Sequence, residues 1–440
     1  MSRLTASSTF LAGLQWLFFM FTNTIVIPLS LGAALHLSSS EITSSVQRSF
    51  IYTGIACLLQ VFLGHRFALM EGQSGLWWGV ILSLAAIASS SGTDLGVVGG
   101  SLATGIMIAG LLIALLGGLG IGKVLNKIFT PIVMSVFLLL LASQLILIFF
   151  KGMLGLSGNG QISIPEAGLS IFLVLLVTWL NLKGKGLISN FSILIGIIVG
   201  WLIHSLWIPS SALSTTADGV LFEWFPWGSP QLEWGIVITA VLAGLLNTTN
   251  TIATLREAED LFEKPVSDRI YKRSFIVTGI NTTISGIFGL VPYAPYTSSI
   301  GFLRTTRILE RSAFIVGSIL FMILGLIPAL GSFFSTLPMS VGDAVLFVAY
   351  LQLFGSALRY LEGIRFNSKT IYRIAAPTLL GIAIINLPAA SLSSIPMYLR
   401  PLLSNGLLMG ILVAIIIENT VNWSSYEISK VKQEARNKAC

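Results

Sequence analysis

Charged residues are scarce in this chain of 440 residues. Lys, Arg, Asp and Glu together make up 10% of it, whereas 54% of the residues are hydrophobic and the mean hydropathy is +0.88. A soluble domain carries roughly a quarter charged residues. The shortage of charge therefore excludes a soluble globular protein and predicts an all-α polytopic membrane protein surrounded by lipid.

Cysteines and chemical motifs are also few. The two cysteines, Cys57 in an apolar segment and Cys440 near the end, cannot form a disulfide framework or a metal cluster. Neither a nucleotide-binding motif nor a nucleophile motif occurs, so an enzyme and an ATP-driven pump have no support. We expect no cofactor. We also expect no nucleic-acid partner, because the net charge of +7 mostly reflects cationic cytoplasmic loops.

Apolar windows predict about fourteen membrane-spanning segments of ~20 residues each. Their approximate centres are Thr22, Ala56, Ile81, Ala109, Leu139, Val174, Ile197, Ala243, Gly279, Leu303, Met322, Val348, Leu379 and Val413. With the N-terminus inside, only Arg48, Lys151 and Arg400 fall outside, and the other 22 of the 25 Lys and Arg residues fall inside. The positive-inside rule therefore predicts a cell-membrane protein with cytoplasmic termini, including a cytoplasmic tail over 422–440.

The longest predicted loop, Ile208 to Glu233, lies between the seventh and eighth spans. Two halves of seven spans each would have opposite orientations and form an inverted repeat. Weak internal similarity supports this arrangement, since the fifth span begins with Pro131 and carries Ala142 and Gln144, and the twelfth begins with Pro338 and carries Ala349 and Gln352.

Two of the spans are interrupted. In the tenth, Gly279 to Arg307, an apolar stretch runs into Pro292 and Pro295, which stop a continuous helix. The third opens with a polar, glycine-containing stretch from Gly64 to Trp78. Irregular backbone at membrane depth usually lines a cavity, and it exposes the N-terminus of a half-helix to the solute. The alternative for the tenth span is a tight extracellular turn between two ordinary helices.

Several motifs resemble those of the nucleobase/ascorbate transporter family, also called nucleobase–cation symporter-2. The matching segments are LQWLFFMFTNTIVIP from Leu14 to Pro28, ISGIFG from Ile284 to Gly289, then Gly301, Thr306 and Arg307, and finally Pro338, Val341 and Gly342. The resemblance implies a fourteen-span fold, often dimeric, that moves a nucleobase between a core and a gate subdomain. The core would comprise 10–120 and 235–331, and the gate 128–207 and 338–421.

The chain departs from this family where acidic and amide residues are usual. Ser298 and Ser299 stand where the tenth-span motif has Gln or Glu and Asn. In the eighth span, Asn247 takes the position of a Glu and Thr251 that of an Asp, with Asn250 at a Gly position. Asp343 replaces a second Gly of the twelfth-span motif.

A flat nucleobase with alternating donors and acceptors needs a stacking surface and hydrogen bonds from a dry pocket. Amide and hydroxyl side chains suit such an edge. The candidate substrate-binding residues are Asn247, Thr251, Ser298, Ser299, Gln73, Ser74 and Trp16, with Trp77 and Phe18 as further stacking rings. The alternatives are hydrogen bonds that tie helices together, helix capping, and tryptophans that anchor the chain at the lipid interface.

Proton coupling requires a titratable group near the membrane midplane. Glu71, beside the interruption of the third span, is the first candidate and Asp343 the second. The alternative for Glu71 is an interfacial acid paired with Arg66 or His65. We expect a secondary active transporter that imports a purine base of the xanthine, hypoxanthine or urate class with protons. A uracil symporter, an uncoupled facilitator and an anion transporter of the same architecture remain alternatives.

Overall fold

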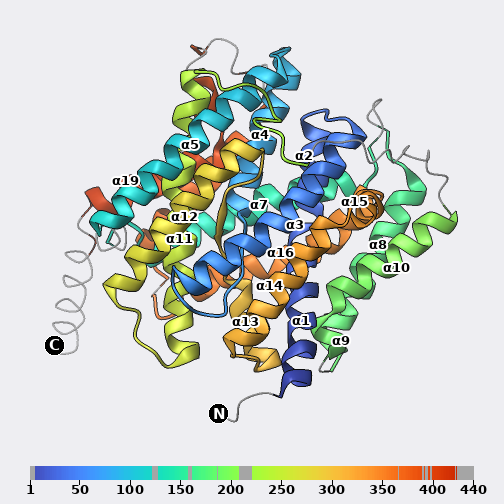
Figure 1. Ribbon diagram of the computed structural model, residues 1–440. Coiled ribbons are helices and arrows are strands. Elements are labelled where there is room, and N and C mark those ends of the chain that lie inside the picture. Colours follow the sequence, from blue (N-terminus) through green and yellow to red (C-terminus); the bar gives the residue numbers. More distant parts are fainter. Residues whose placement is uncertain are drawn as a thin grey trace, which may run out of the picture.

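A computed structural model of the chain describes residues 5–120, 127–156, 161–185, 187–207, 221–364, 366–388, 391, 395–396, 399–421 and 423. The tail predicted over 422–440 lies almost entirely outside these residues, as does the first half of the central loop. Within them the chain is helical apart from two short strands and the connecting segments (Figure 1).

The first half contains α1 (Ala6–Thr24), α2 (Val26–Ala34), α3 (Ser39–Phe62), β1 (Glu71–Gln73), α4 (Gly75–Ser91), α5 (Leu95–Leu119), α7 (Pro131–Met153), α8 (Ile164–Lys183), α9 (Leu187–Asn190) and α10 (Ser192–Trp207). The second half contains α11 (Trp234–Phe262), α12 (Asp268–Phe288), β2 (Tyr293–Pro295), α13 (Ser298–Thr306), α14 (Arg311–Leu326), α15 (Pro328–Ser335), α16 (Met339–Arg359), α17 (Ser368–Ile385), α18 (Arg400–Leu403) and α19 (Gly406–Thr420).

All fourteen predicted span centres lie in helices. By length and composition, seven helices of the described chain could cross a membrane, or eight if the bent pair α14 and α15 counts as one span. The shorter apolar helices include α10, α19 and Gly75–Ser89 of α4. A half-helix cannot pass such a length test, and the buried polar side chains of α3 and α12 lower their hydropathy. The exact number of spans therefore stays a prediction.

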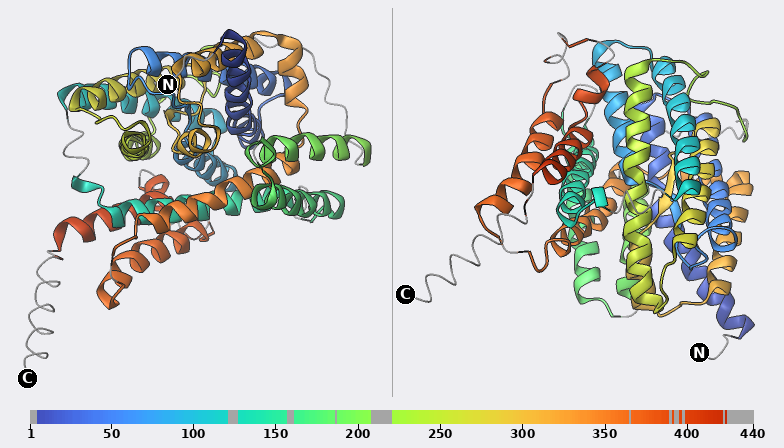
Figure 2. Two further views of the ribbon diagram at one scale, coloured as in Figure 1. Left: turned by 90° about the horizontal axis from the view of Figure 1, so that it is seen from below. Right: turned by 90° about the vertical axis from the view of Figure 1, so that its left-hand side faces the viewer.

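The helices form two groups that lie side by side (Figure 2). In one group, α5 packs along α11 and α12, α11 contacts α4 and α13, and α14 packs along α1 and α3. In the other, α16 packs along α7, α8 and α10, and α17 packs along α7 and α19. The division into a core subdomain over 10–120 and 235–331 and a gate subdomain over 128–207 and 338–421 stays a prediction.

Close helix contacts in the first group depend on glycine. A Cβ atom on Gly279 of α12 would lie 2.5 Å from the backbone nitrogen of Ala114 and 2.6 Å from the carbonyl oxygen of Gly110, both on α5. Small residues permit such an approach between membrane helices, where van der Waals packing drives association. The long contact between α5 and α12 therefore requires glycine at position 279.

The two interrupted segments meet inside the protein. Strand β1 pairs antiparallel with β2, with Glu71 opposite Pro295, Gly72 opposite Ala294 and Gln73 opposite Tyr293. All the residues of both strands are buried. The expected breaks in the third and tenth spans are thus confirmed, and an extracellular turn at the tenth span is wrong.

The tenth span is interrupted earlier than its prolines suggested. Helix α12 already ends at Phe288, where Gly289 adopts the left-handed conformation with φ of 58°. This conformation favours glycine because other residues meet a Cβ clash there. Pro292 lies beyond that point, and its carbonyl oxygen accepts a hydrogen bond of 2.9 Å from the backbone N–H of Ser74. Glycine ends the helix, and the prolines follow in the extended backbone.

Candidate substrate-binding site

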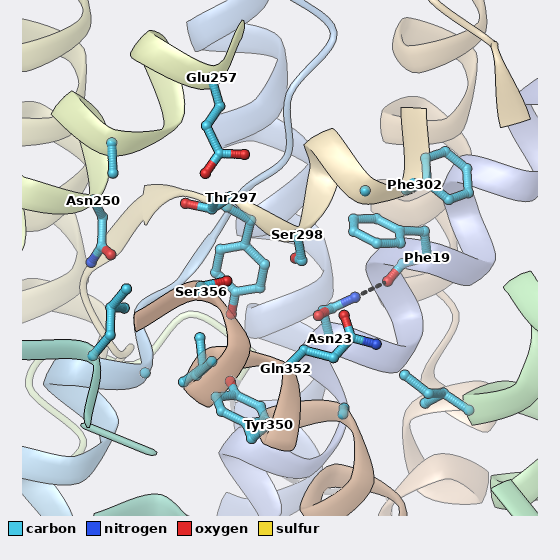
Figure 3. Close-up of a pocket in the computed structure, with 18 of the residues that line it drawn as sticks. Phe19, Asn23, Asn250, Glu257, Thr297, Ser298, Phe302, Tyr350, Gln352 and Ser356 are labelled. Carbon is cyan, nitrogen blue, oxygen red and sulfur yellow. Dashed lines mark hydrogen bonds between the residues drawn. The ribbon is translucent and has the colours of Figure 1, made fainter. Parts of the chain in front are cut away.

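A cavity of about 430 Å³ lies between the two groups of helices (Figure 3). Its lining comes from α1, α4, α11 and α13 in the first group and from α7, α10 and α16 in the second. Such a volume is in the range of small-molecule sites. The cavity is therefore placed where residues of both groups can contact one solute.

Two helices begin at this cavity. Ser74 and Gly75, at the start of α4, and Thr297 and Ser298, at the start of α13, all line it. The first N–H groups of a helix have no partner within the helix. Since the strand pair holds both helix starts at the cavity, their partial positive charges lie close to a bound solute. In α13 the N–H groups of Ser299 and Ile300 already donate to the carbonyl oxygens of Tyr296 and Thr297.

A hydrogen-bond network on α11 fixes both half-helices. Asn247 accepts a 2.6 Å hydrogen bond from the hydroxyl of Ser74 and donates one of 3.1 Å to the carbonyl oxygen of Tyr293. Its amide oxygen also accepts from Nδ2 of Asn250 at 2.9 Å. Asn247 is fully buried and does not line the cavity, whereas Asn250 does. Asn247 thus links α11 to both interrupted segments. Asn250 lines the cavity with an amide group whose Nδ2 already donates to Asn247.

Further polar and aromatic side chains of both groups line the cavity. Tyr350 and Gln352 come from α16, and Asn23 and Phe19 come from α1 (Figure 3). The ring of Phe19 lies 4.7 Å from that of Phe302 on α13, with 33° between the ring planes. An aromatic surface and amide groups at one cavity are the elements that bind a flat heterocycle.

The candidates predicted from sequence fall into two sets. Ser74 and Ser298 line the cavity, as does the stacking candidate Phe18. The others are buried outside the lining: Asn247, Thr251, Ser299, Gln73, Trp16 and Trp77. Several of these have structural partners. Ser299 accepts a hydrogen bond from the N–H of Met70, Gln73 donates to Ser49, and Trp16 packs between Phe302 and Phe314.

Glu71 lies behind the strand pair. Its Oε1 accepts hydrogen bonds from Nε2 of Gln60 at 3.2 Å and from the hydroxyl of Thr278 at 3.0 Å. The Cβ direction of the next residue, Gly72, points to the ring of Tyr296, which lines the cavity. Because side chains alternate along a strand, Glu71 faces away from the cavity. It is buried among core polar groups rather than paired at an interface.

Asp343 lies in the first turns of α16, where it is buried away from the cavity. A Cβ on Gly152 at the end of α7 would overlap its carboxyl oxygen. Gly152 therefore makes room for this carboxyl group inside the second group of helices.

Four of the polar lining residues that sequence reasoning did not name as candidates are Asn23, Asn250, Tyr350 and Gln352. Asn250 follows Asn247 by three residues, a spacing that places both on one helix face. Asn23 lies within the first-span motif, and Gln352 was noted only as a sign of the repeat. A polar residue inside a membrane span commonly faces the protein interior, and that signal was available for all four.

The fold is found in solved membrane transporters. The chain is similar to the transmembrane domain of a cyanobacterium bicarbonate transporter, BicA, with a TM-score of 0.64 at 16% identity over 92% of this chain and 96% of that chain. It is also similar to SLC26A9, with a TM-score of 0.60 at 13% identity over 93% and 65% of the two chains. These neighbours share the inverted repeat of seven plus seven segments, and this fold is therefore that of a multi-pass membrane protein.

Relatives by sequence are named as permeases. The protein named "Putative purine permease YwdJ" of Bacillus subtilis (strain 168) is 28% identical over 94% of this chain and 96% of its own length. A xanthine permease of the same organism is 24% identical over 96% and 95%. The uric acid transporter UacT of Escherichia coli (strain K12) is 25% identical over 99% and 90%.

A family model described as "Permease family" (Xan_ur_permease) matches residues 7–390. This range includes the cavity, both half-helices and the first- and tenth-span motifs. The chain therefore belongs to this family of permeases, the nucleobase/ascorbate transporter family, and is a transporter rather than an enzyme.

Proposed function

We propose that this protein is a secondary active transporter that imports a purine base of the xanthine, hypoxanthine or urate class. The observation that carries the proposal is the cavity at which α4 and α13 begin, lined by hydroxyl and amide groups from both groups of helices. The names of the relatives, which include purine, xanthine and uric acid permeases, support the same class of substrate.

A purine would lie between the half-helix starts and α16. Ser74, Asn250 and Ser298 offer donors and acceptors on the first side, and Gln352 and the Tyr350 hydroxyl offer them from the other. The Phe19 ring supplies an apolar surface for the face of the base (Figure 3). Each buried hydrogen bond that a wrong solute leaves unmade costs ~1–3 kcal/mol, so the polar edge of the base sets selectivity.

Coupling to protons is part of the proposal, with Glu71 as the first candidate and Asp343 as the second. A change of protonation at Glu71 would alter its bonds to Gln60 and Thr278 at the rear of β1. The front of β1 is held through the carbonyl oxygen of Gln73, which accepts a hydrogen bond from the hydroxyl of the cavity residue Tyr296. This path joins the carboxyl group to the substrate cavity without direct contact.

The test is uptake of radiolabelled xanthine and of radiolabelled uracil by cells that make the full-length protein and lack purine uptake of their own. We expect xanthine accumulation that an uncoupler abolishes and that purines compete for better than uracil. Preferential uracil uptake would overturn the purine assignment and favour a pyrimidine symporter. Uptake that only equilibrates xanthine, with or without the uncoupler, would show a facilitator. A facilitator is the second candidate function because Glu71 does not line the cavity.

Orientation and assembly belong to the same proposal. We expect cytoplasmic termini and insertion in the cell membrane, with a homodimer as the assembled form. Labelling of single cysteines introduced at Ser8 and at Trp423 in intact cells, with a reagent that cannot cross the membrane, tests the orientation. Reaction of either site would contradict it. The mass of the purified protein in detergent, corrected for bound detergent, tests the dimer.

A further inference from the structure

Opposite charges lie on the two groups of helices at one end of the cavity. The lining includes Glu257 near the end of α11 and Arg304 near the end of α13, both in the first group. From the second group it includes Arg359, the last residue of α16. Helix α13 runs from the centre of the cavity toward the end of the bundle where the chain starts (Figure 1). We call this end of the cavity, lined by these three charged residues, the mouth.

Glu257 is fixed to the first group beside the start of α13. One turn earlier on α11, the hydroxyl of Thr254 donates at 3.1 Å to the carbonyl oxygen of Pro295 and lies 2.9 Å from the hydroxyl of Thr297. The carboxylate of Glu257 points from α11 toward Thr297 (Figure 3). Since these bonds tie α11 to the half-helix, Glu257 and α13 must move together.

The charges at the mouth attract one another without being paired in this conformation. Arg359 and Arg304 both lie close enough to Glu257 for their charges to act on it. Within the part of the chain that the structure describes, the Glu257 carboxylate nevertheless makes neither an ion pair nor a hydrogen bond. Nη2 of Arg359 donates instead at 2.8 Å to the hydroxyl of Ser356 on its own helix. Helices α11 and α16 do not pack along one another, and the cavity lies between them.

Motion of one group relative to the other would change only one of the two charge separations. Arg304 belongs to the same group as Glu257, so a rigid-body motion leaves their distance unchanged. Arg359 belongs to the other group, so its distance from Glu257 falls when the mouth narrows. A contact that forms in only one of two conformations shifts the equilibrium between them, whereas a contact present in both does not.

We propose that Glu257 and Arg359 form an ion pair across the mouth when the two groups of helices close it. The pair stabilises the conformation in which the cavity is closed at this end. Exclusion of water from the closed mouth strengthens the attraction, because the local dielectric constant falls. The inference concerns the motion of the two groups and holds for any solute that the cavity takes.

The size of the effect follows from the position of the pair. An ion pair in contact with water changes an equilibrium by a few-fold, and partial loss of water raises this figure. Neutralising either partner should therefore lower the ratio of closed to open mouths by about three- to tenfold.

Double electron–electron resonance on the full-length protein in lipid nanodiscs tests the pair in the absence of any solute. Spin labels are placed at Asp260→Cys on α11 and Glu362→Cys just beyond α16, two exposed positions near the mouth. Cys440→Ser removes one native cysteine, and Cys57 is buried from the reagent. We expect two distances between the labels, the shorter one from proteins with a closed mouth.

The variants separate an ion pair from independent charges. Glu257→Gln and Arg359→Gln should each lower the ratio of shorter to longer distances by about three- to tenfold. Glu257→Arg combined with Arg359→Glu should restore most of the shorter distance, because the pair forms again with its charges exchanged. Arg304→Gln is the matched control. It also removes an arginine from the mouth, but from the group that carries Glu257, and should leave the ratio nearly unchanged.

Transport gives a second readout. Closing the mouth is part of each cycle, so the initial rate of xanthine uptake should fall in Glu257→Gln and in Arg359→Gln and recover in the charge-exchanged variant. A pair of residues that only attracts solute to the mouth, or only supports the fold, would not recover on exchange.

Three results would overturn the inference. The shorter distance could be missing when both charges are present, the two neutral variants could keep its full share, or the charge-exchanged variant could behave like the single ones. Failure of the proposed function has a different signature: no variant takes up xanthine, yet the distances between the labels change as described.

Discussion

Asn247→Ala should destabilise the protein as well as reduce transport. The asparagine is fully buried and takes part in hydrogen bonds with Ser74, Tyr293 and Asn250. Alanine leaves the Tyr293 carbonyl without its side-chain donor, and the hydroxyl of Ser74 keeps only a long contact of 3.5 Å to Asn250. A buried group left unpaired costs ~1–3 kcal/mol, so two such groups cost about 2–6 kcal/mol.

The assay for this loss is thermal stability in detergent, followed by size-exclusion chromatography of the heated sample, together with xanthine uptake. A substitution of this cost should lower the melting temperature by several degrees. Uptake should fall about ten- to hundredfold or more, because the half-helices lose their link to α11. Asn250→Ala is the matched control. It also removes an asparagine of α11, but from the cavity lining, and should weaken substrate affinity with a smaller loss of stability.

Opposite behaviour of the two variants would contradict the structural role of Asn247. Asn247→Ala with unchanged melting temperature but weakened substrate affinity would mean that this residue contacts the solute directly. Normal stability and normal uptake would mean that the hydrogen bonds of Asn247 contribute nothing measurable.

Three further substitutions test other parts of the structure. Glu71→Gln keeps an acceptor for Gln60 and Thr278 but cannot exchange a proton. Accumulation of xanthine driven by a pH gradient should therefore be lost, while exchange of xanthine across the membrane persists. Unchanged pH-driven accumulation would contradict a role of Glu71 in proton coupling. Gly279→Ala should lower the free energy of unfolding by at least about 1–3 kcal/mol, because the added Cβ forces α5 and α12 apart. The control is Gly168→Ala on α8, where a Cβ meets nothing within 4 Å, and it should leave the melting temperature unchanged or raised. Equal effects of the two substitutions would contradict the close packing at Gly279. Glu418→Gln should lower the melting temperature, because Arg373 loses the charged partner that it bonds at 2.6 and 2.7 Å. The double variant Arg373→Leu with Glu418→Leu should recover part of this loss. No recovery would argue against a buried ion pair.

The interruption of two spans was predictable because its chemical signals are local. Prolines and glycines within apolar sequence forbid a continuous helix, whatever surrounds them. The pairing of β1 with β2 was not predictable in its register, because it joins residues more than two hundred positions apart. Only the packing of the two halves decides that Gly72 lies opposite Ala294.

The role of Asn247 at the site could likewise not be predicted from the sequence. Its position in the family motif indicated importance, but a buried amide has the same sequence signal whether it binds a solute or ties helices together. In the structure Asn250 lines the cavity, whereas Asn247, three residues earlier on α11, is buried outside the lining. Likewise, hydropathy alone could not tell that Trp16 packs among phenylalanines while Phe19 borders the cavity.

The hydrogen bonds between the two groups of helices also indicate which side of the cavity is closed. Nε2 of Gln144 on α7 donates at 2.8 Å to the carbonyl oxygen of Gly79 and to the hydroxyl of Ser83, both on α4. These bonds join the groups along α4, which leads from the cavity toward one end of the bundle. The cavity lining instead continues along α13 to Thr305, toward the other end, where the chain starts (Figure 1). Release of the solute along α4 would have to break the bonds of Gln144. Asn247 joins α4 and β2 into one unit. We therefore expect the group that contains α7 and α16 to move relative to that whole unit rather than to either half-helix alone.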